Sequence, residues 1–352
     1  MPREFVVTAP RSIEYREYAE RPLQPDEVRV EVLVSGIKHG TEMSLYTGDT
    51  PFRESSFDPE FRLFVPREGT QFYPCRLGSW GCGRVVEAGA GVTRFAVGEM
   101  VHGEMAHRPT NVVREANLFR LAPGMKPEVA VFTDPAIFAL GAVHDAQIKV
   151  GDRVAVFGLG ALGLIGVQIA RLNGAERVYA VDRIPARLAL ARQFGADEAL
   201  DAGTCDPAFE IKRLTGNKGV DAAVDISGAY GALNAAIRSV QPGGLVVTAS
   251  YFKGDAGALQ LGAEWHHNRV TLLGSMPVWG MPHRCYPLWD LARTRQTALR
   301  LLETGRVAVE PMIGPRFPYD RAAEAYRLIY EHPEAAVKVL LDYPAQLQTF
   351  ER

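Results

Sequence analysis

The chain has 352 residues, 47% of them hydrophobic and 23% charged, and a formal net charge of −2. This length allows about two domains with substantial cores, and the near-neutral charge gives no reason to expect nucleic acid or an anionic membrane as partner. No apolar stretch approaches the roughly 20 residues of a membrane span, the N-terminus lacks a signal-peptide pattern, and the four cysteines fit no metal-finger spacing. The cysteines are interpreted as reduced thiols, so we expect a cytoplasmic protein.

The first third of the chain, residues 5–120, is rich in strand signals. Residues 28–32 alternate apolar and charged side chains, which is typical of a half-buried strand. Residues 84–98 combine a strand pattern with glycines that indicate turns. We expect a mostly β domain in this part of the chain.

After Gly151 the pattern changes to alternating strands and helices. The sequence predicts strands at 154–157, 178–181, 220–226, 245–250 and 270–273, and helices at 162–173 and 185–194. Such alternation favours an α/β fold with a doubly wound parallel sheet. Further along, amphipathic helices are expected at 291–304 and 320–330, followed by a strand at 336–341.

A glycine motif follows the first of these strands. Residues 158–163 read Gly-Leu-Gly-Ala-Leu-Gly, which fits G-x-G-x-x-G between a strand and a helix. Gly158 permits a tight turn, Gly160 lets the backbone approach a pyrophosphate, and Gly163 lets helix and strand pack closely. With Leu162 in the same loop and free N–H groups at the helix start, the motif predicts a dinucleotide-binding Rossmann unit.

Asp182 ends the next strand, nineteen residues after Gly163. A carboxylate there accepts hydrogen bonds from the ribose hydroxyls and repels a 2′-phosphate, so NAD is the expected cofactor. Arg183 beside it can hold that phosphate and keeps NADP open. Ser227 and Ser250 end later strands, at the sheet edge where such folds bind ligands, and are expected to line the cofactor site.

These residues resemble the medium-chain dehydrogenase/reductase family, which includes alcohol and sorbitol dehydrogenases. Residues 151–154, before the glycine loop, and 83–98, in the β-rich part, are similar to family segments.

The resemblance implies a GroES-like β-barrel catalytic domain at 1–145, completed by 288–352, and a Rossmann NAD-binding domain at 146–287. It also implies a homodimer or homotetramer paired through residues 270–275, with Ser275 against the nicotinamide.

The positions that hold the zinc ligands in that family carry other residues in this chain. Zinc-dependent members carry Cys before Gly-Thr/Ser-Asp, where this chain has residues 39–42, His-Gly-Thr-Glu. Their later His-Glu pair is replaced by Ser79 and Trp80, a poor ligand and a non-ligand. The structural four-cysteine lobe is missing. His39, Glu42 and Asp134 keep a residual metal site open, but the sequence favours a zinc-independent branch with no metal.

Without a Lewis acid, the reacting oxygen must be polarised by hydrogen bonds or served by a proton relay. Thr41 matches the family's relay hydroxyl, and His39 is a candidate proton donor because imidazole titrates near neutrality. Lys38 is the rival for that role. If the segment is extended, residues 39 and 41 point to the same side; if it is helical, they diverge by about 160 degrees.

The predicted function is a zinc-independent, NAD-dependent interconversion of a secondary alcohol and its ketone, with a polyol, sugar or larger hydroxy compound as substrate. Three alternatives stay open. They are reduction of a quinone or enone by NAD(P)H, an epimerase or lyase that retains NAD, and a non-catalytic dinucleotide-binding protein. Residues 49–76, rich in Phe and Arg, are candidates to cover the substrate.

Overall fold

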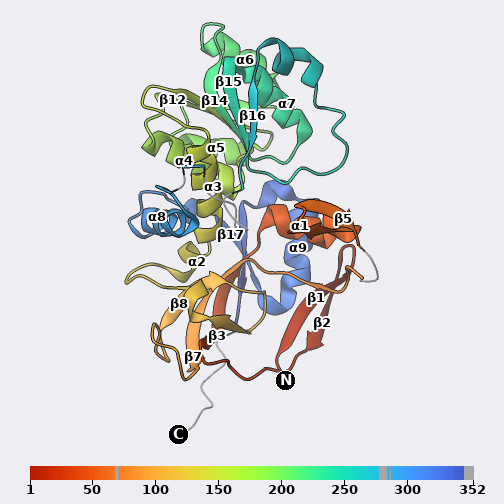
Figure 1. The fold of residues 1–352 in the computed structure, drawn as a ribbon, viewed down its shortest axis with the longest axis vertical. Coiled ribbons are helices and arrows are strands. Elements are labelled where there is room, and N and C mark those ends of the chain that lie inside the picture. Colours follow the sequence, from red (N-terminus) through yellow and green to blue (C-terminus); the bar gives the residue numbers. More distant parts are fainter. Residues whose placement is uncertain (68–70, 277–283, 286, 345–352) are drawn as a thin grey trace. The chain divides into compact units, whose positions relative to one another are not determined.

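The computed structural model describes residues 1–67, 71–276, 284–285 and 287–344 (Figure 1). The chain divides into two compact units, one formed by Met1–Val131 with Ile313–Arg352 and the other by Phe132–Met312. Each unit is described by itself below. The mixed α/β architecture confirms the predicted fold class.

The first unit is built on a mixed sheet that joins both ends of the sequence. Among the described residues this sheet has seven strands in the order β10-β8-β7-β3-β18-β17, with β9 also paired to β3. Their bounds are β3 (Glu27–Gly36), β7 (Trp80–Ala88), β8 (Met100–Glu104), β9 (Thr110–Arg114), β10 (Leu118–Arg120), β17 (Ile313–Pro318) and β18 (Lys338–Asp342). The alternation in β3 buries Val28, Val30 and Val32 in the core, as expected for that segment.

Smaller elements complete this unit. A second sheet has the order β2-β1-β6, and β4 and β5 form a hairpin. The bounds are β1 (Arg3–Ala9), β2 (Ser12–Glu17), β4 (Ser55–Asp58), β5 (Leu63–Pro66), β6 (Cys75–Arg76), α1 (His39–Thr47), α2 (Pro127–Ala130) and α9 (Ala322–Glu331). Helix α9 contacts α1, so a helix from the end of the chain packs beside one from its beginning.

The second unit contains a parallel sheet in the order β13-β12-β11-β14-β15-β16 within the described part of the chain. The strands are β11 (Arg153–Phe157), β12 (Arg177–Asp182), β13 (Glu198–Asp201), β14 (Val220–Asp225), β15 (Val240–Thr248) and β16 (Thr271–Gly274). The helices are α3 (Thr133–Asp145), α4 (Ala161–Leu172), α5 (Pro185–Gln193), α6 (Pro207–Leu214), α7 (Tyr230–Ser239) and α8 (Leu291–Glu303). Read from β11 outward, this is the strand order of the Rossmann fold.

The unit boundaries differ from the domain limits expected at 145/146 and 287/288. Helices α3 and α8 belong to the second unit, because α3 packs on α4 and α8 packs on α3. The nearly continuous burial of α3 explains this, since an apolar helix needs partners on all sides. No helix in the described part of the chain is long and apolar enough to cross a membrane.

Candidate active site

The glycine loop joins β11 to α4 in a conformation that depends on its glycines. Gly158 has a φ of 85°, and a Cβ there would lie 2.6 Å from the Cα of Ser227. A Cβ on Gly163 would lie 1.8 Å from the carbonyl oxygen of Gly158. At Gly160, by contrast, no atom lies within 4 Å of such a Cβ, so the backbone there is open to a ligand. The loop therefore fits a dinucleotide pyrophosphate, with Leu162 half-buried behind it.

Asp182, at the end of β12, is tied directly to this loop. Its Oδ2 accepts a hydrogen bond from the Leu159 amide at 2.6 Å, and its Oδ1 accepts from the amides of Arg183 and Ile184 at 2.7 and 3.0 Å. An ionised carboxylate can accept about four hydrogen bonds, which leaves capacity for a ribose hydroxyl. The guanidinium of Arg187 lies 4.0 Å from Oδ2, while Arg183 is exposed.

Three serines that the sequence predicted for the cofactor site follow neighbouring strands. Ser227, Ser250 and Ser275 come just after the carboxyl ends of β14, β15 and β16, so the parallel sheet brings them to one edge. Ser275 is buried, its amide donates to the Thr248 carbonyl at 2.8 Å, and its Oγ has no hydrogen-bond partner among the described residues.

Asp225 is a buried carboxyl at the same edge. Its Oδ1 accepts from the Ser227 amide at 3.0 Å, and its Oδ2 has no partner in the described part of the chain. Burial raises the pKa of Asp225, and the hydrogen bonds from Ser227 lower it by less, so the resulting pKa is about 6. The carboxyl therefore holds the turn that Gly158 packs against.

The segment that carries the predicted catalytic residues is helical. Helix α1 begins at His39, with Lys38 preceding it, and Thr41 lies in its first turn. Thr41 is exposed, while Lys38 and His39 are half-buried. Because the segment is helical, we expect residues 39 and 41 to leave the helix in directions about 160 degrees apart. The helical geometry therefore does not favour a close pair of these two side chains.

Glu42 of the same helix is buried, with 2% of its surface exposed. Its Oε1 accepts from the Lys38 amide at 2.7 Å, and its Oε2 accepts from His107 Nε2 at 2.9 Å and from the Tyr326 hydroxyl. Burial alone would raise the pKa of Glu42, but the ion pair with His107 and the hydrogen bonds from Tyr326 and Lys38 outweigh it and lower the pKa. The sequence read Glu42 as a candidate metal ligand; here both of its oxygens already have partners.

The network continues beyond His107 to Ser35 and Tyr343. His107 Nδ1 lies 2.7 Å from Ser35 Oγ, which lies 3.0 Å from the Tyr343 hydroxyl. A carboxylate, an imidazole and a serine in this order resemble a hydrolase triad. Ser35, however, is 0% exposed, so its hydroxyl cannot reach a substrate. The chain of contacts therefore fixes α1 to β3, to α9 and to the segment after β18.

Trp80, at the family's metal-ligand position, is part of the core of the sheet. Its Nε1 donates to His102 Nδ1 at 3.0 Å, and its ring stacks on Phe119 with centroids 6.1 Å apart. Burial lowers the pKa of His102 to about 4, which keeps the imidazole neutral as an acceptor. The sequence identified Trp80 as a non-ligand from its chemistry; its packing against His102 was not predicted.

The remaining candidate metal ligands are His39, Glu42 and Asp134, and zinc independence stays a prediction. His39 and Glu42 belong to the first unit, and Asp134 lies in the first turn of α3 in the second. Across the described ranges, no three His, Cys, Asp or Glu side chains are grouped so as to hold a metal ion. Catalytic zinc needs three protein ligands, and this donor set does not fit it.

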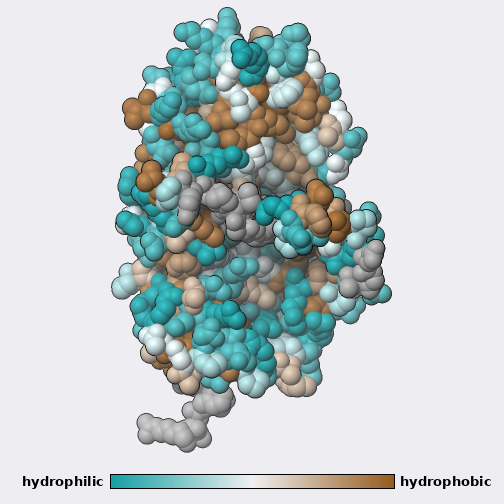
Figure 2. All heavy atoms as spheres, viewed as in Figure 1, coloured by the Kyte–Doolittle hydropathy of each residue, from teal (hydrophilic) through white to brown (hydrophobic). Residues whose placement is uncertain are grey.

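The aromatic segment after α1 forms the β4–β5 hairpin. The rings of Phe52 and Phe57 pack against Phe64, with centroids 5.3 and 5.4 Å away, while Phe61 and Leu63 are exposed. Figure 2 shows hydrophobic side chains gathered where Figure 1 labels β5. That this segment covers the substrate stays a prediction.

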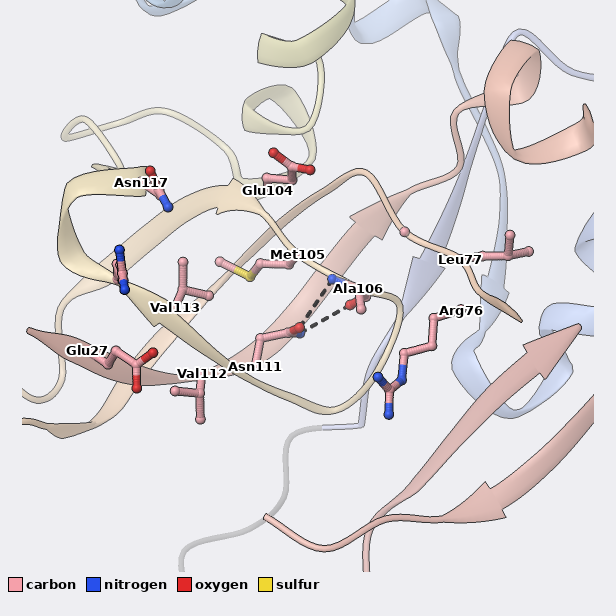
Figure 3. A pocket seen from close by; sticks show the side chains of 12 residues that line it. Glu27, Arg76, Leu77, Glu104, Met105, Ala106, Asn111, Val112, Val113 and Asn117 are labelled. Atoms are coloured by element: carbon pink, nitrogen blue, oxygen red, sulfur yellow. Dashed lines mark hydrogen bonds between the residues drawn. The ribbon is translucent and has the colours of Figure 1, made fainter. Parts of the chain in front are cut away.

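A groove of about 490 Å³ lies elsewhere in the first unit (Figure 3). The Oδ1 of Asn111 accepts from the Ala106 amide and its Nδ2 donates to the Ala106 carbonyl, both at 3.1 Å. Glu27 pairs with Arg21 at 2.7 Å. These polar groups are satisfied from within the protein, and none of the predicted catalytic or cofactor-binding residues lines the groove, so we do not assign it a ligand.

Comparison with known proteins identifies relatives of the chain. The family model described as zinc-binding dehydrogenase matches residues 161–294. The chain is 35% identical over 346 residues to D-guloside 3-dehydrogenase of Escherichia coli K12, covering 96% of this chain and 99% of that one. It is 28% identical over 289 residues to (R,R)-butanediol dehydrogenase of Bacillus subtilis, covering 73% and 78% of the two chains.

Solved structures give the same fold. An alcohol dehydrogenase from Thermus sp. ATN1 superposes with a TM-score of 0.75 at 24% identity, covering 97% of this chain and all of that one. An NAD-dependent alcohol dehydrogenase superposes with a TM-score of 0.77 at 25% identity, covering 97% and 99%.

A chain that combines a Rossmann sheet and this glycine loop with a unit of the GroES-like type is typical of a nicotinamide-dependent dehydrogenase. The chain belongs to the medium-chain dehydrogenase/reductase family, in its alcohol dehydrogenase-like branch. It is an NAD(P)-dependent oxidoreductase that interconverts a small-molecule alcohol and its ketone, which confirms the predicted class of reaction.

The buried Glu42–His107 pair should dominate the stability of the first unit. Removing one member of a buried ion pair costs about 3–5 kcal/mol, so Glu42→Ala is expected to lower the free energy of unfolding by that amount at pH 7. Because the folded-state pKa of Glu42 is lowered, its contribution is complete above the ordinary value of 4.5 and is lost as the pH falls through the lower folded value. Urea unfolding at several pH values measures both effects.

The matched control is Glu104→Ala, which removes an exposed carboxylate and should change the free energy of unfolding by less than about 0.5 kcal/mol. A loss below about 1 kcal/mol for Glu42→Ala at pH 7 would contradict the structural importance of the pair.

Proposed function

We propose that the protein is a zinc-independent, NAD-dependent dehydrogenase that oxidises a secondary hydroxyl of a sugar or glycoside to a ketone. The observation that carries this proposal is the similarity to D-guloside 3-dehydrogenase along 96% of the chain, combined with a carboxylate at the ribose position of the cofactor loop. We infer that it works in the cytoplasm, in keeping with Cys75, Cys82 and Cys205, which form no disulfide among the described residues.

The cofactor preference rests on Asp182. When bound, the nicotinamide supplies the acceptor for the substrate's hydride. The backbone of the glycine loop and the start of α4 bind the pyrophosphate, and Asp182 binds the ribose hydroxyls. Its charge opposes a 2′-phosphate, although Arg183 and Arg187 stand near enough to favour one. We infer that the Asp182 carboxylate outweighs the two arginines, because its hydrogen bond with the glycine loop orients it toward the ribose position.

The catalytic side chains in this proposal are His39 and Thr41. Both lie at the start of α1, the segment that by family resemblance faces the nicotinamide. The exposed hydroxyl of Thr41 relays the proton of the alcohol to water, accepting that proton as it donates its own, because a hydroxyl does not ionise near neutral pH and cannot act as the base itself. His39 contacts the reacting oxygen from the other side of the helix end.

The direct test offers NAD and a panel of hexopyranosides that differ at one hydroxyl group. We expect NADH to form with glycosides and the ketone to appear at one secondary carbon. Asp182→Ala should weaken NAD binding by roughly 10-fold or more, because charge-assisted hydrogen bonds contribute about 1.5–3 kcal/mol. It should also relax discrimination against NADP, while Asp197→Ala, a matched change at a salt-bridged carboxylate outside the loop, should do neither.

Two results would reject the proposal. A tenfold preference of the wild-type protein for NADP would reject the cofactor. Conversion of a sugar to its epimer with retained cofactor and no net NADH would indicate an epimerase.

Zinc independence has its own test. Protein purified without chelator should contain well under one zinc per chain, and turnover should survive dialysis against a chelator. The reason is that the family's ligand positions hold Ser79 and Trp80, and Trp80 is committed to His102. Stoichiometric zinc that is lost together with activity on His39→Ala would overturn this part of the proposal.

We also propose that the chain forms homodimers or homotetramers through β16. This strand pairs with β15 on one side and ends the sheet among the described residues, with Leu272 exposed. An open sheet edge is commonly paired with a second copy. Light scattering at micromolar concentration should therefore give at least a dimer. Leu272→Asp should shift the protein toward monomer and Val150→Asp, at another exposed position, should not; a monomeric wild-type protein would refute this assembly.

A further inference from the structure

Asp225 ends β14 inside the parallel sheet of the second unit, and none of its surface is exposed. Phe157 of β11 and Thr248 of β15 lie opposite it, and its carbonyl accepts from the Ala249 amide at 3.0 Å. The side chain is engaged on one side only. Oδ1 accepts from the Ser227 amide at 3.0 Å, whereas Oδ2 has no hydrogen-bond partner among the described residues. This is a costly place for a negative charge, because an ionised group taken out of water needs partners.

The pKa of Asp225 is set by its burial and by Ser227. Burial raises this pKa, the Ser227 hydrogen bonds lower it by less, and the result is about 6. Strand β15 carries no titratable residue. The titratable residues on the other elements packed against β14, and on the adjoining segments, are not among the influences on this pKa. They are Arg153 of β11, Asp221 of β14, Arg171 of α4, Asp182 after β12, Tyr230 and Arg238 of α7, and Tyr251, Lys253 and Asp255 after β15.

One turn connects this carboxyl to the glycine loop. Oδ1 of Asp225 holds the Ser227 amide, and a Cβ on Gly158 would lie 2.7 Å from that amide nitrogen. The loop therefore packs directly against the N–H group that the carboxyl binds. The same surface is open to a ligand, because Ser227 is exposed and no atom lies within 4 Å of a Cβ on Gly160. A dinucleotide bound on the loop would cover this turn and bring two phosphate charges to it.

Both effects of a bound dinucleotide act on the Asp225 proton in the same direction. Removing water from the turn disfavours the ionised carboxyl, and negative charge nearby disfavours it as well, so each raises its pKa. By linkage, a ligand that raises the pKa of a group binds more tightly to the protonated form. The ligand then takes up a proton wherever the free protein is ionised, and for Asp225 that range begins at about pH 6.

We propose that Asp225 is a positioning residue for the cofactor that acts in its neutral form, so that NAD binds together with one proton taken from solvent. This inference rests on the proposed function. The neutral carboxyl still accepts the Ser227 N–H through its carbonyl oxygen, so the turn keeps its hydrogen bond. The new O–H bond forms on Oδ2, the oxygen that this amide does not use. No buried negative charge then lies beside the pyrophosphate.

Calorimetric titration with NAD alone, in buffers of different ionisation enthalpy, measures the protons taken up. At about pH 7 the wild-type protein should take up a large part of one proton per NAD, and its Kd should rise by up to about tenfold per pH unit above pH 6. Asp225→Asn offers the Ser227 amide a neutral acceptor of the same shape. It should bind NAD as tightly as the wild type does at pH 6, with no proton uptake. The matched control is Asp221→Asn at the other end of β14, where the carboxylate accepts from the Arg153 amide at 2.8 Å; it should keep the wild-type uptake.

Two further measurements need no activity. Carbon NMR of protein labelled at the aspartate carboxyl should give Asp225 a pKa of about 6 without NAD and a higher pKa with it. Because the folded-state pKa lies above the ordinary value of 3.8, the stabilising effect of this group is lost as the pH rises through the folded value. Asp225→Asn should therefore have a higher urea midpoint than wild type at about pH 8, and the difference should shrink as the pH falls from about 6 towards 4.

The inference is wrong if Asp225 titrates near 3.8, if wild-type NAD affinity does not change between about pH 6 and 8, or if proton uptake persists in Asp225→Asn. A purely structural role predicts weaker binding in that variant by the same factor at every pH, which would also contradict it. Wild-type calorimetry decides the matter if the variant does not fold. These outcomes leave the proposed function standing while the wild type binds NAD and forms NADH, whereas a wild type that binds no NAD removes both.

Discussion

The first unit depends on one buried negative charge. A carboxylate taken out of water must be paired and hydrogen-bonded, or the fold loses several kcal/mol. Glu42 meets that demand with partners from three places in the chain, the residue before its own helix, the loop after β8 and helix α9. The requirement therefore links the start, the middle and the end of the sequence, and it holds the first turn of α1 against the sheet.

The loop of the second unit and the helix start of the first unit are held in position by different kinds of contact. In the second, placement comes from the backbone, because glycines at 158 and 163 leave no room for a side chain and Asp182 pins the loop through the Leu159 amide. In the first, it comes from side chains that form hydrogen bonds with main-chain groups, as Lys338 and His39 do where α1 meets β18. A rigid backbone suits a cofactor common to a whole family, whereas side-chain contacts can change with the substrate.

The sequence predicted the cofactor unit well because its signals are local. The strands, the glycine motif and Asp182 lie within 30 residues, and each carries a periodicity or a residue type with a clear physical meaning. Strand β13, of four residues, and helices α6 and α7 were not predicted. At α1 the run His-Gly-Thr-Glu has no decisive periodicity, so its helical form stayed open. The partners of Glu42 could not be predicted, since Tyr326 is 284 residues away and nothing local marks the pairing.

The position of β18 near the end of the chain has a consequence for biosynthesis. Lys338 is 301 residues from the Ile37 carbonyl that it binds, so α1 leaves the ribosome long before the strand that completes its surroundings. Domains generally fold as they emerge, N-terminal parts first, but this unit must wait for its last strand. A prematurely terminated product that lacks residues 338–343 would keep the strands of the second unit's sheet and would lack several partners of the helix that carries the proposed catalytic residues. Synthesis at least as far as Tyr343 is thus a condition for completing the first unit.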